Sequence, residues 1–206
     1  MKKQHVMALT LSLACALVVL ASAAYTARAD EPVAPVVAIG ATVADFTLPD
    51  ADGAAHSLNS LKGKNGTVLI FIATKCPVSN GYNERMEKLA QDYRTKGINV
   101  VGINANVTEP ASEVKSHAAA KHLTFTILKD EGSKLADRLG AQRTPEVFFL
   151  DADNRLVYHG RIDNAQNPAN VTANDLRDAL DAVLAGKPVA KGEAKAFGCS
   201  IKRAAS

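Results

Sequence analysis

The chain has 206 residues, of which 24 are Lys or Arg and 21 are Asp or Glu, so its formal net charge is +3. Three of the basic residues, Lys2, Lys3 and Arg28, precede residue 30, and the rest of the chain carries 21 residues of each sign. This balance, without a basic stripe, excludes the charge pattern that is typical of nucleic-acid binding. We therefore expect no nucleic-acid partner.

Residues 1–29 have the pattern of a secretory signal peptide. Two lysines precede an apolar stretch, and the segment ends in Ala27-Arg28-Ala29, which suits a signal peptidase. We expect cleavage before Asp30 and export, with the periplasm as the expected compartment and no membrane contact afterwards. The alternative is a retained anchor, because the apolar stretch approaches the length that spans a bilayer.

Cleavage would leave 177 residues, a length typical of one domain with a sizeable core. We predict an extended, proline-rich lead-in over residues 30–42, one domain over residues 43–186 and a C-terminal tail over residues 187–206. Two cysteines remain, Cys76 and Cys199, which are too few for a disulfide scaffold. In an oxidising compartment they indicate either one bridge or thiol chemistry.

The first half of the domain predicts a hairpin, a strand and a helix. Residues 45–58 contain two short extended pieces around an Asp-Gly pair, which is a hairpin signal. Residues 67–73 (TVLIFIA) lack polar alternation, which indicates a strand that is buried on both faces. Apolar residues then recur every three or four positions from Pro77 to about Thr95, which predicts one helix. Proline suits the first turn of a helix because its missing N–H needs no partner there.

Strands and helices alternate through the rest of the domain, which is typical of the α/β class. The tail carries little structural signal, although it contains Cys199. The predicted elements are a strand over residues 98–104, a helix over 111–121, a strand over 124–128, a short helix over 134–139, a hairpin of strands over 147–151 and 155–162, a polar loop over 164–173 and a helix around 176–184.

This order of elements resembles that of a thioredoxin-like domain. A hairpin leads to a strand, a Cys-Pro-x-Ser turn at residues 76–79 and a helix, and Thr144-Pro145 opens the closing hairpin. The opening DFTLPDADG and the inserted helical unit make residues 43–185 most similar to the redoxin branch. That branch includes the alkyl hydroperoxide reductase/thiol-specific antioxidant family and the periplasmic thiol–disulfide oxidoreductases. The resemblance implies a three-layer α/β/α sandwich with an N-terminal β-hairpin and an inserted helical unit.

Cys76 lies where the predicted strand ends and the predicted helix begins. Unpaired N–H groups and the positive end of the helix dipole favour a thiolate at this position. We expect Lys75 to add a positive charge nearby and the Ser79 hydroxyl to donate a hydrogen bond to the sulfur. The alternative is an inert, buried cysteine.

The resemblance also implies a substrate-binding set around the nucleophile. It implies that Pro145 is cis and faces Cys76, so that the main chain of Thr144 is free to hold a substrate strand. We place Pro77 and Lys75 beside the sulfur in the same set. Glu146 is expected to be a surface or turn carboxylate, like Asp45, Asp151 and Asp163, and its place next to Pro145 makes it a candidate for substrate contact.

Ser79 stands where a Cys-Pro-x-Cys site has its second thiol, and a serine cannot resolve a mixed disulfide. Cys199 is the remaining candidate for that role, with Lys202 and Arg203 favouring a thiolate there. A resolving cysteine in the tail resembles the layout of two-cysteine peroxiredoxins. Two alternatives remain open: a structural Cys76–Cys199 bond, which the chain-entropy model values at about 4–5 kcal/mol, and resolution by an outside thiol.

The sequence therefore predicts an exported thiol–disulfide oxidoreductase without a cofactor or a resident metal. Its expected partners are protein or small-molecule disulfides or thiols, and an external thiol reductant or oxidase. A peroxiredoxin-like peroxidase with antioxidant activity is the alternative. Against it, Leu69 and Ala73 occupy the positions where peroxiredoxins carry Pro and Thr. A third hypothesis is a copper-binding protein, because thiolates and the imidazole of His159 suit copper.

Overall fold

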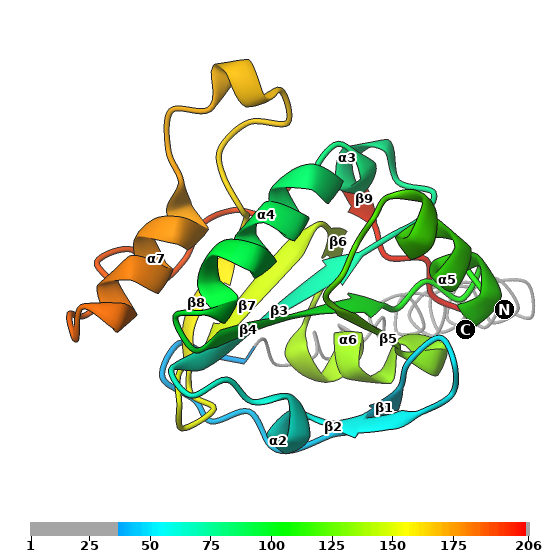
Figure 1. The fold of residues 1–206 in the computed structure, drawn as a ribbon, viewed down its shortest axis with the longest axis horizontal. Coiled ribbons are helices and arrows are strands. Elements are labelled where there is room, and N and C mark those ends of the chain that lie inside the picture. The colour runs from blue at the N-terminus through cyan, green and yellow to red at the C-terminus, as the bar shows by residue number, and fades with distance from the viewer. Residues whose placement is uncertain (1–36, 205–206) are drawn as a thin grey trace, which may run out of the picture. The chain divides into compact units, whose positions relative to one another are not determined.

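A five-stranded sheet forms the centre of the computed structural model, which describes residues 37–204 (Figure 1). The predicted signal peptide and most of the predicted lead-in thus lie outside the described residues. The strand order is β5-β4-β3-β7-β8. Three strands are parallel, β3 (Gly66–Ile72), β4 (Ile98–Asn104) and β5 (Thr126–Lys129), whereas β7 (Glu146–Leu150) and β8 (Leu156–Gly160) form an antiparallel hairpin beside β3.

The central strand β3 is buried along its whole length, as its apolar sequence predicted. Alternate side chains of a strand point to opposite faces, so Val68 and Ile70 join one core cluster, while Leu69 and Phe71 join the other. The first cluster includes side chains of α4 (Asn83–Arg94), α5 (Ala111–Ala120) and α7 (Asp175–Leu184), and the second those of α2 (Leu58–Leu61) and α6 (Lys134–Leu139). The predicted α/β/α sandwich is confirmed.

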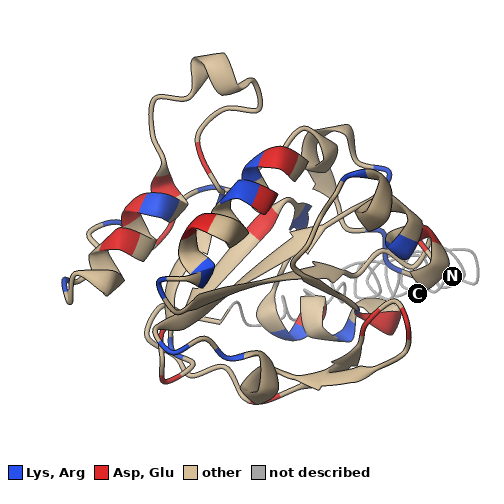
Figure 2. Cartoon of the chain, in the orientation of Figure 1, with Lys and Arg blue, Asp and Glu red and all other residues tan. Residues whose placement is uncertain are grey.

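Both predicted hairpins are present. β1 (Thr47–Pro49) pairs with β2 (Ala55–Ser57) in antiparallel register, and β7 pairs with β8 across the predicted turn. Two short 3-10 segments, Glu131–Ser133 and Pro168–Asn170, precede α6 and α7. Acidic and basic residues alternate along α4 (Figure 2), which is typical of a solvated helix face.

The single helix predicted from Pro77 to about Thr95 was wrong, because the chain breaks it into α3 (Pro77–Asn80) and α4. The N–H of Tyr82 donates to the carbonyl of Ser79, three residues back, instead of continuing the regular pattern. The phenol of Tyr82 donates to a carboxylate oxygen of Asp163 at 2.7 Å. This tertiary contact holds the joint between the two helices.

The tail, for which the sequence carried little signal, pairs with two parts of the domain. It first follows β8, where the N–H of Ala194 donates to the carbonyl of His159 at 3.0 Å. It then forms β9 (Cys199–Ser200), which pairs with β6 (Arg143–Thr144) in antiparallel register. Figure 1 shows β9 next to α3 and β6. In the part of the chain described here, no helix has both the length and the apolar character needed to cross a membrane.

Candidate active site around Cys76

Cys76 caps the N-terminus of α3 at the carboxyl end of β3. The residue is only 3% exposed. Its Sγ accepts a hydrogen bond from the N–H of Ser79 at 3.3 Å, which satisfies one of the donors that a helix start leaves free. On the other side the thiol donates to the carbonyl of Thr144 at 3.4 Å. The sulfur therefore lies between the start of a helix and the loop that carries Thr144.

The peptide bond between Thr144 and Pro145 is cis, as the resemblance implied. Glu146 holds the preceding loop: one carboxylate oxygen accepts the N–H groups of Gln142 at 2.7 Å and Arg143 at 2.6 Å. The other oxygen lies 2.7 Å from Nε2 of His159. Glu146 is thus buried, not at the surface as predicted, because the loop main chain supplies its hydrogen-bond donors.

Strand β9 brings Cys199 to Cys76. Cys199 lies opposite Thr144 in the β6–β9 pairing, close enough to Cys76 for each thiol to shift the pKa of the other. Both cysteines are free thiols. The preceding Gly198 has a φ of +138°, and a Cβ at that position would lie 2.1 Å from the carbonyl oxygen of Thr144. A glycine is therefore needed for the tail to approach this closely.

The pKa values of the two thiols are shifted in opposite directions. Burial raises the pKa of Cys76, but the neighbouring Cys199 thiol and the N–H of Ser79 outweigh burial and leave this pKa below its ordinary value. The closeness of Cys76, followed by burial, raises the pKa of Cys199. A coupled pair of this kind titrates as a unit. Its first negative charge is held at Cys76, with Cys199 as a donor.

The structure differs from the sequence prediction in how Ser79 and Lys75 act on Cys76. The Ser79 hydroxyl oxygen accepts the N–H of Ala73 at 3.1 Å, and the bond to the sulfur comes from the main chain of Ser79 instead. The ammonium group of Lys75 lies 2.8 Å from a carboxylate oxygen of Glu113 and is largely exposed. Its charge is compensated by Glu113, which the sequence could not show because the two residues lie far apart along the chain.

Asp163 also differs from its predicted place at the surface. It is buried beside α4, where it accepts a hydrogen bond from Arg85 at 2.6 Å in addition to the one from Tyr82. The ring of Phe197, from the tail, packs edge-on against Tyr82 with 6.2 Å between the ring centroids. The same tyrosine thus connects the joint between α3 and α4 to the tail.

Sequence reasoning missed a buried carboxylate that supports the loop before Cys76. Glu109 is 1% exposed, and its carboxylate accepts the N–H groups of Thr74 at 2.9 Å and Lys75 at 3.1 Å. The side-chain amide of Asn104 donates to it at 2.5 Å. Burial raises the pKa of Glu109, but these hydrogen bonds outweigh burial and leave it below its ordinary value. The available signal was its position in the polar stretch that follows a buried strand.

Asn106 joins this buried carboxylate to the tail. Its carbonyl accepts the N–H of Glu109 at 3.2 Å, and its side-chain oxygen accepts the N–H of Lys202 at 2.6 Å. The neighbouring Val107 donates its N–H to the carbonyl of Lys202 at 2.9 Å. The loop that presents the nucleophile and the segment after β9 therefore share one set of hydrogen bonds.

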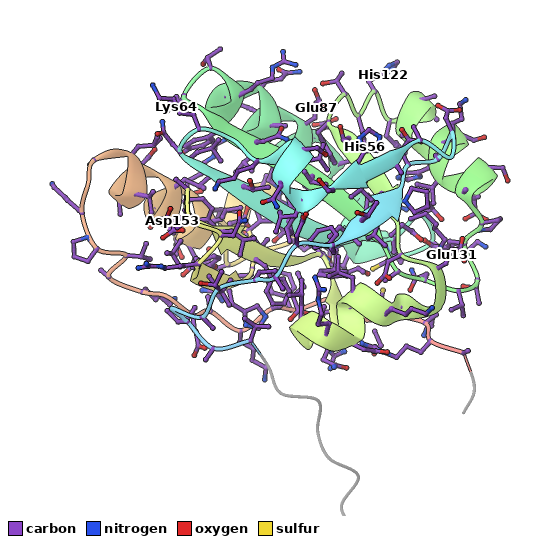
Figure 3. All side chains as sticks on the ribbon, turned by 90° about the horizontal axis from the view of Figure 1, so that it is seen from below. His56, Lys64, Glu87, His122, Glu131 and Asp153 are labelled. Atoms are coloured by element: carbon purple, nitrogen blue, oxygen red, sulfur yellow. The ribbon has the colours of Figure 1, made fainter. Side chains whose placement is uncertain are left out.

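Two of the histidines in residues 37–204 contact groups other than the cysteines. His159, named in the copper hypothesis, stacks on Phe148 with 4.3 Å between ring centroids, in addition to its contact with Glu146. His56 lies on the β1–β2 hairpin (Figure 3), with Nε2 2.8 Å from a carboxylate oxygen of Asp50. Within residues 37–204, no three His, Cys, Asp or Glu side chains are grouped so as to hold a metal ion.

Comparisons with known proteins identify relatives of this chain. The model of the AhpC/TSA family matches residues 39–159. The thiol-disulfide oxidoreductase ResA of Geobacillus thermodenitrificans is 31% identical over 159 residues, which are 76% of this chain and 87% of that protein. ResA of Halalkalibacterium halodurans is 30% identical over 118 residues, which are 57% of this chain and 65% of that protein. A solved structure, the hypothetical protein SMc02350 from Sinorhizobium meliloti 1021, has a TM-score of 0.78 and 37% identity, covering 84% of this chain and 98% of that one.

Proposed function

Because the chain belongs to the AhpC/TSA family, we propose that it is a thiol–disulfide oxidoreductase in which Cys76 is the nucleophile and Cys199 is the resolving thiol. The observation that carries this proposal is the pairing of β9 with β6, which sets the Cys199 thiol against the buried sulfur of Cys76. The relatives named thiol-disulfide oxidoreductase support the oxidoreductase class.

The reaction begins at Cys76, because the thiolate is the attacking form and the pKa of this thiol is lowered. Its sulfur attacks a substrate disulfide, forms a mixed disulfide with one substrate sulfur and releases the other as a thiolate. Cys199 then attacks Sγ of Cys76, forms the Cys76–Cys199 bond and releases the second substrate sulfur. The substrate gains two electrons, and an external thiol reductant restores the two protein thiols. With an external oxidase the same steps run in reverse.

The pKa of Cys199 falls at the step of the reaction in which this thiol is needed. Cys76 is the main cause of the raised pKa of Cys199, through its closeness and through its negative charge. Formation of the mixed disulfide removes that charge. The pKa of Cys199 then falls, aided by the positive charge of Lys202, which already acts to lower it. The resolving thiol is thus kept protonated until it is needed.

The remaining residues of the site have separate roles in this proposal. Lys75 and Pro77 are exposed on either side of the buried cysteine and offer contacts to a substrate. Thr144 and Pro145 present the main chain opposite the sulfur, and Ser79 supplies an N–H to it. Glu146 positions the loop from behind. The signal-peptide pattern of residues 1–29 supports export, with the periplasm as the proposed compartment.

Peroxide reduction is the second candidate, because a thiolate next to a second thiol also suits that chemistry and the resemblance to the redoxin branch includes alkyl hydroperoxide reductases. Peroxiredoxins use a Pro and a Thr before the reactive cysteine to orient the peroxide. Here the position of the Pro is taken by Leu69, which is fully buried in the second core cluster. Thr74 lies one residue out of register with the Thr, and its hydroxyl is hydrogen-bonded to Glu113. Both observations favour disulfide exchange as the main activity.

The test compares four forms of the mature protein: the parent, Cys76→Ser, Cys199→Ser and the double variant. We expect the reduced parent to cleave a model disulfide and Cys76→Ser to be inactive. Cys199→Ser should accumulate a covalent adduct on Cys76, detectable by mass spectrometry, whereas the parent should not. Equal exchange by the parent and Cys76→Ser would refute the proposal. Faster turnover of peroxide than of disulfide would make the second candidate the main activity, and tight copper binding without exchange would favour a metal carrier.

A further inference from the structure

The β9 strand occupies the surface through which a substrate would have to reach Cys76. We call this surface the β6 seat and define it as the main chain of residues 142–144 together with the thiol of Cys76. The β9 residues pair with β6 at Thr144 and Arg143, and the N–H of Ile201 donates to the carbonyl of Gln142 at 3.0 Å. With the tail in place, Cys76 is 3% exposed, so no disulfide on another molecule can contact its sulfur.

Three side chains anchor the tail on both sides of Cys199. Upstream, Phe197 packs against Tyr82. Downstream, Ile201 is buried in the second core cluster, and Arg203 forms an ion pair with Asp137 at 2.6 Å. These contacts surround an extended strand whose cysteine lies at the nucleophile. The site therefore contains a ligand of known sequence and register, supplied by its own chain.

We propose that β9 is a displaceable internal ligand of the β6 seat, so that a substrate strand reaches Cys76 only when β9 leaves the seat. This inference rests on the proposed function, in which the main chain at Thr144 holds a substrate strand, and adds to it the displacement of the tail, a sequence preference and a release step. Main-chain pairing of an added strand with an exposed strand edge gives affinity, and the neighbouring side-chain sites give preference. The tail predicts that preference: a glycine before the cysteine, an aliphatic residue two positions after it and an arginine four positions after it.

Release of the product follows from competition for one seat. The substrate strand leaves the seat when the tail returns, and the return of the tail is also the movement that brings Cys199 to the mixed disulfide. Bond exchange and displacement of the strand are therefore one event. The upstream pairing at His159 stays in place throughout, so the displaced tail remains tethered at high effective concentration.

The chain offers a matched pair of variants for a test. Gly198→Ala places a Cβ against the carbonyl of Thr144, at a φ that disfavours any residue but glycine, and should undock β9. Gly192→Ala makes the same change in the same tail, but its Cβ would lie 3.5 Å or more from any neighbour. The first variant tests displacement and the second controls for the substitution itself.

The readout is the alkylation of Cys76 by a bulky maleimide, followed by peptide mapping in a Cys199→Ser background. The rates are compared on their plateau at high pH, where Cys76 is fully a thiolate and a change in its pKa does not affect the comparison. We expect Gly198→Ala to react at least about tenfold faster than the parent and Gly192→Ala to match it. Arg203→Ala removes a partly exposed ion pair, and its Cys76 should react about two- to fivefold faster than that of the parent. This variant replaces Gly198→Ala in the test if Gly198→Ala fails to fold.

A second arm tests the ligand class without any thiol chemistry. A peptide of residues 195–203 that carries Cys199→Ser should slow the alkylation of Cys76 in Gly198→Ala, whereas the same peptide with Ile201→Asp should not. Equal alkylation of the parent, Gly198→Ala and Arg203→Ala would overturn displacement, and a lack of protection by the peptide would overturn the strand ligand. Either result leaves the proposed exchange at Cys76 standing, since that activity is measured separately with a small disulfide.

Discussion

At the residue scale, the closeness of the two thiols lowers the pKa of Cys76 and raises that of Cys199. A buried thiolate without donors would be unfavourable, and Cys76 obtains its donors from the helix start and from Cys199. Cys199 serves as a donor and therefore keeps its proton longer. The site needs no neighbouring cation for this arrangement, because Lys75 is paired with Glu113.

A comparison of two substitutions at Cys199 tests that arrangement. Serine keeps a hydroxyl donor beside Cys76. Alanine removes the donor, so that nothing at residue 199 counters the effect of burial, which raises the pKa of Cys76. We expect the pH midpoint of Cys76 alkylation to lie below that of a free thiol in the parent and Cys199→Ser, and to rise in Cys199→Ala. A midpoint in Cys199→Ala equal to that of Cys199→Ser would show that the residue 199 side chain does not contribute.

The buried carboxylate of Glu109 gives a second prediction at this scale. Its folded-state pKa is lowered, so its contribution to stability is present above the unfolded pKa of about 4.3 and is lost as the pH falls through the folded value. Glu109→Gln replaces an acceptor by a donor and should cost about 1–3 kcal/mol at pH 7. The difference in unfolding free energy between the parent and the variant should shrink as the pH falls below 4. Asp52→Asn, at an exposed carboxylate, is the control.

At the element scale, short segments held by tertiary contacts shape the site. α3 has only four residues, β6 and β9 have two each, and none of them would be stable alone. Glu146 holds the loop that contains β6, and Tyr82 holds the end of α3. The first of these contacts is local, because Glu146 is three residues from Arg143, whereas Tyr82 depends on Asp163, 81 residues further along the chain.

The joint between α3 and α4 can be tested through the phenol of Tyr82. Tyr82→Phe removes its hydrogen bonds to Asp163 and to the carbonyl of Ala165 but keeps the ring that packs on Phe197. We expect a loss of about 1–2 kcal/mol in the free energy of unfolding and a faster alkylation of Cys76. Tyr93→Phe, which removes a similar bond from α4 to Asp181, should lose stability without changing the alkylation of Cys76. Identical alkylation rates in the two variants would contradict this role of Tyr82.

At the scale of the whole molecule, the tail connects the two core clusters. Phe197 packs against the first cluster and Ile201 lies in the second, with Cys199 between them. The tail therefore belongs to the packing of the domain even in the reduced state. A bond between Cys76 and Cys199 would close a long loop, and the chain-entropy model assigns such loops about 4–5 kcal/mol.

Oxidation should consequently raise the melting temperature of the parent, because the bond constrains the unfolded chain. Cys199→Ser is the matched control and should melt at the same temperature with and without oxidant. If the bond is catalytic, a mild reductant should open it and return the parent to the lower melting temperature. A bond that resists mild reductant would instead support the structural alternative.

The sequence by itself determined the features that depend on neighbouring residues. The apolar run of β3 requires burial on both faces, Pro77 after Cys76 predicts a helix start, and the turn signals predict both hairpins. The order of these elements was enough to indicate the thioredoxin-like class. Periodicity and turn chemistry act over a few residues, so they can be read directly from the chain.

The tertiary structure decided the contacts between distant segments. It placed Cys199 at Cys76, assigned the lower pKa to one thiol and the raised pKa to the other, and buried Glu109 and Glu146 behind the loops of the site. It also paired Lys75 with Glu113, away from the role that the sequence suggested. The electrostatic environment of a side chain depends on which groups lie within a few ångströms of it, and those groups are set by the packing of the whole domain.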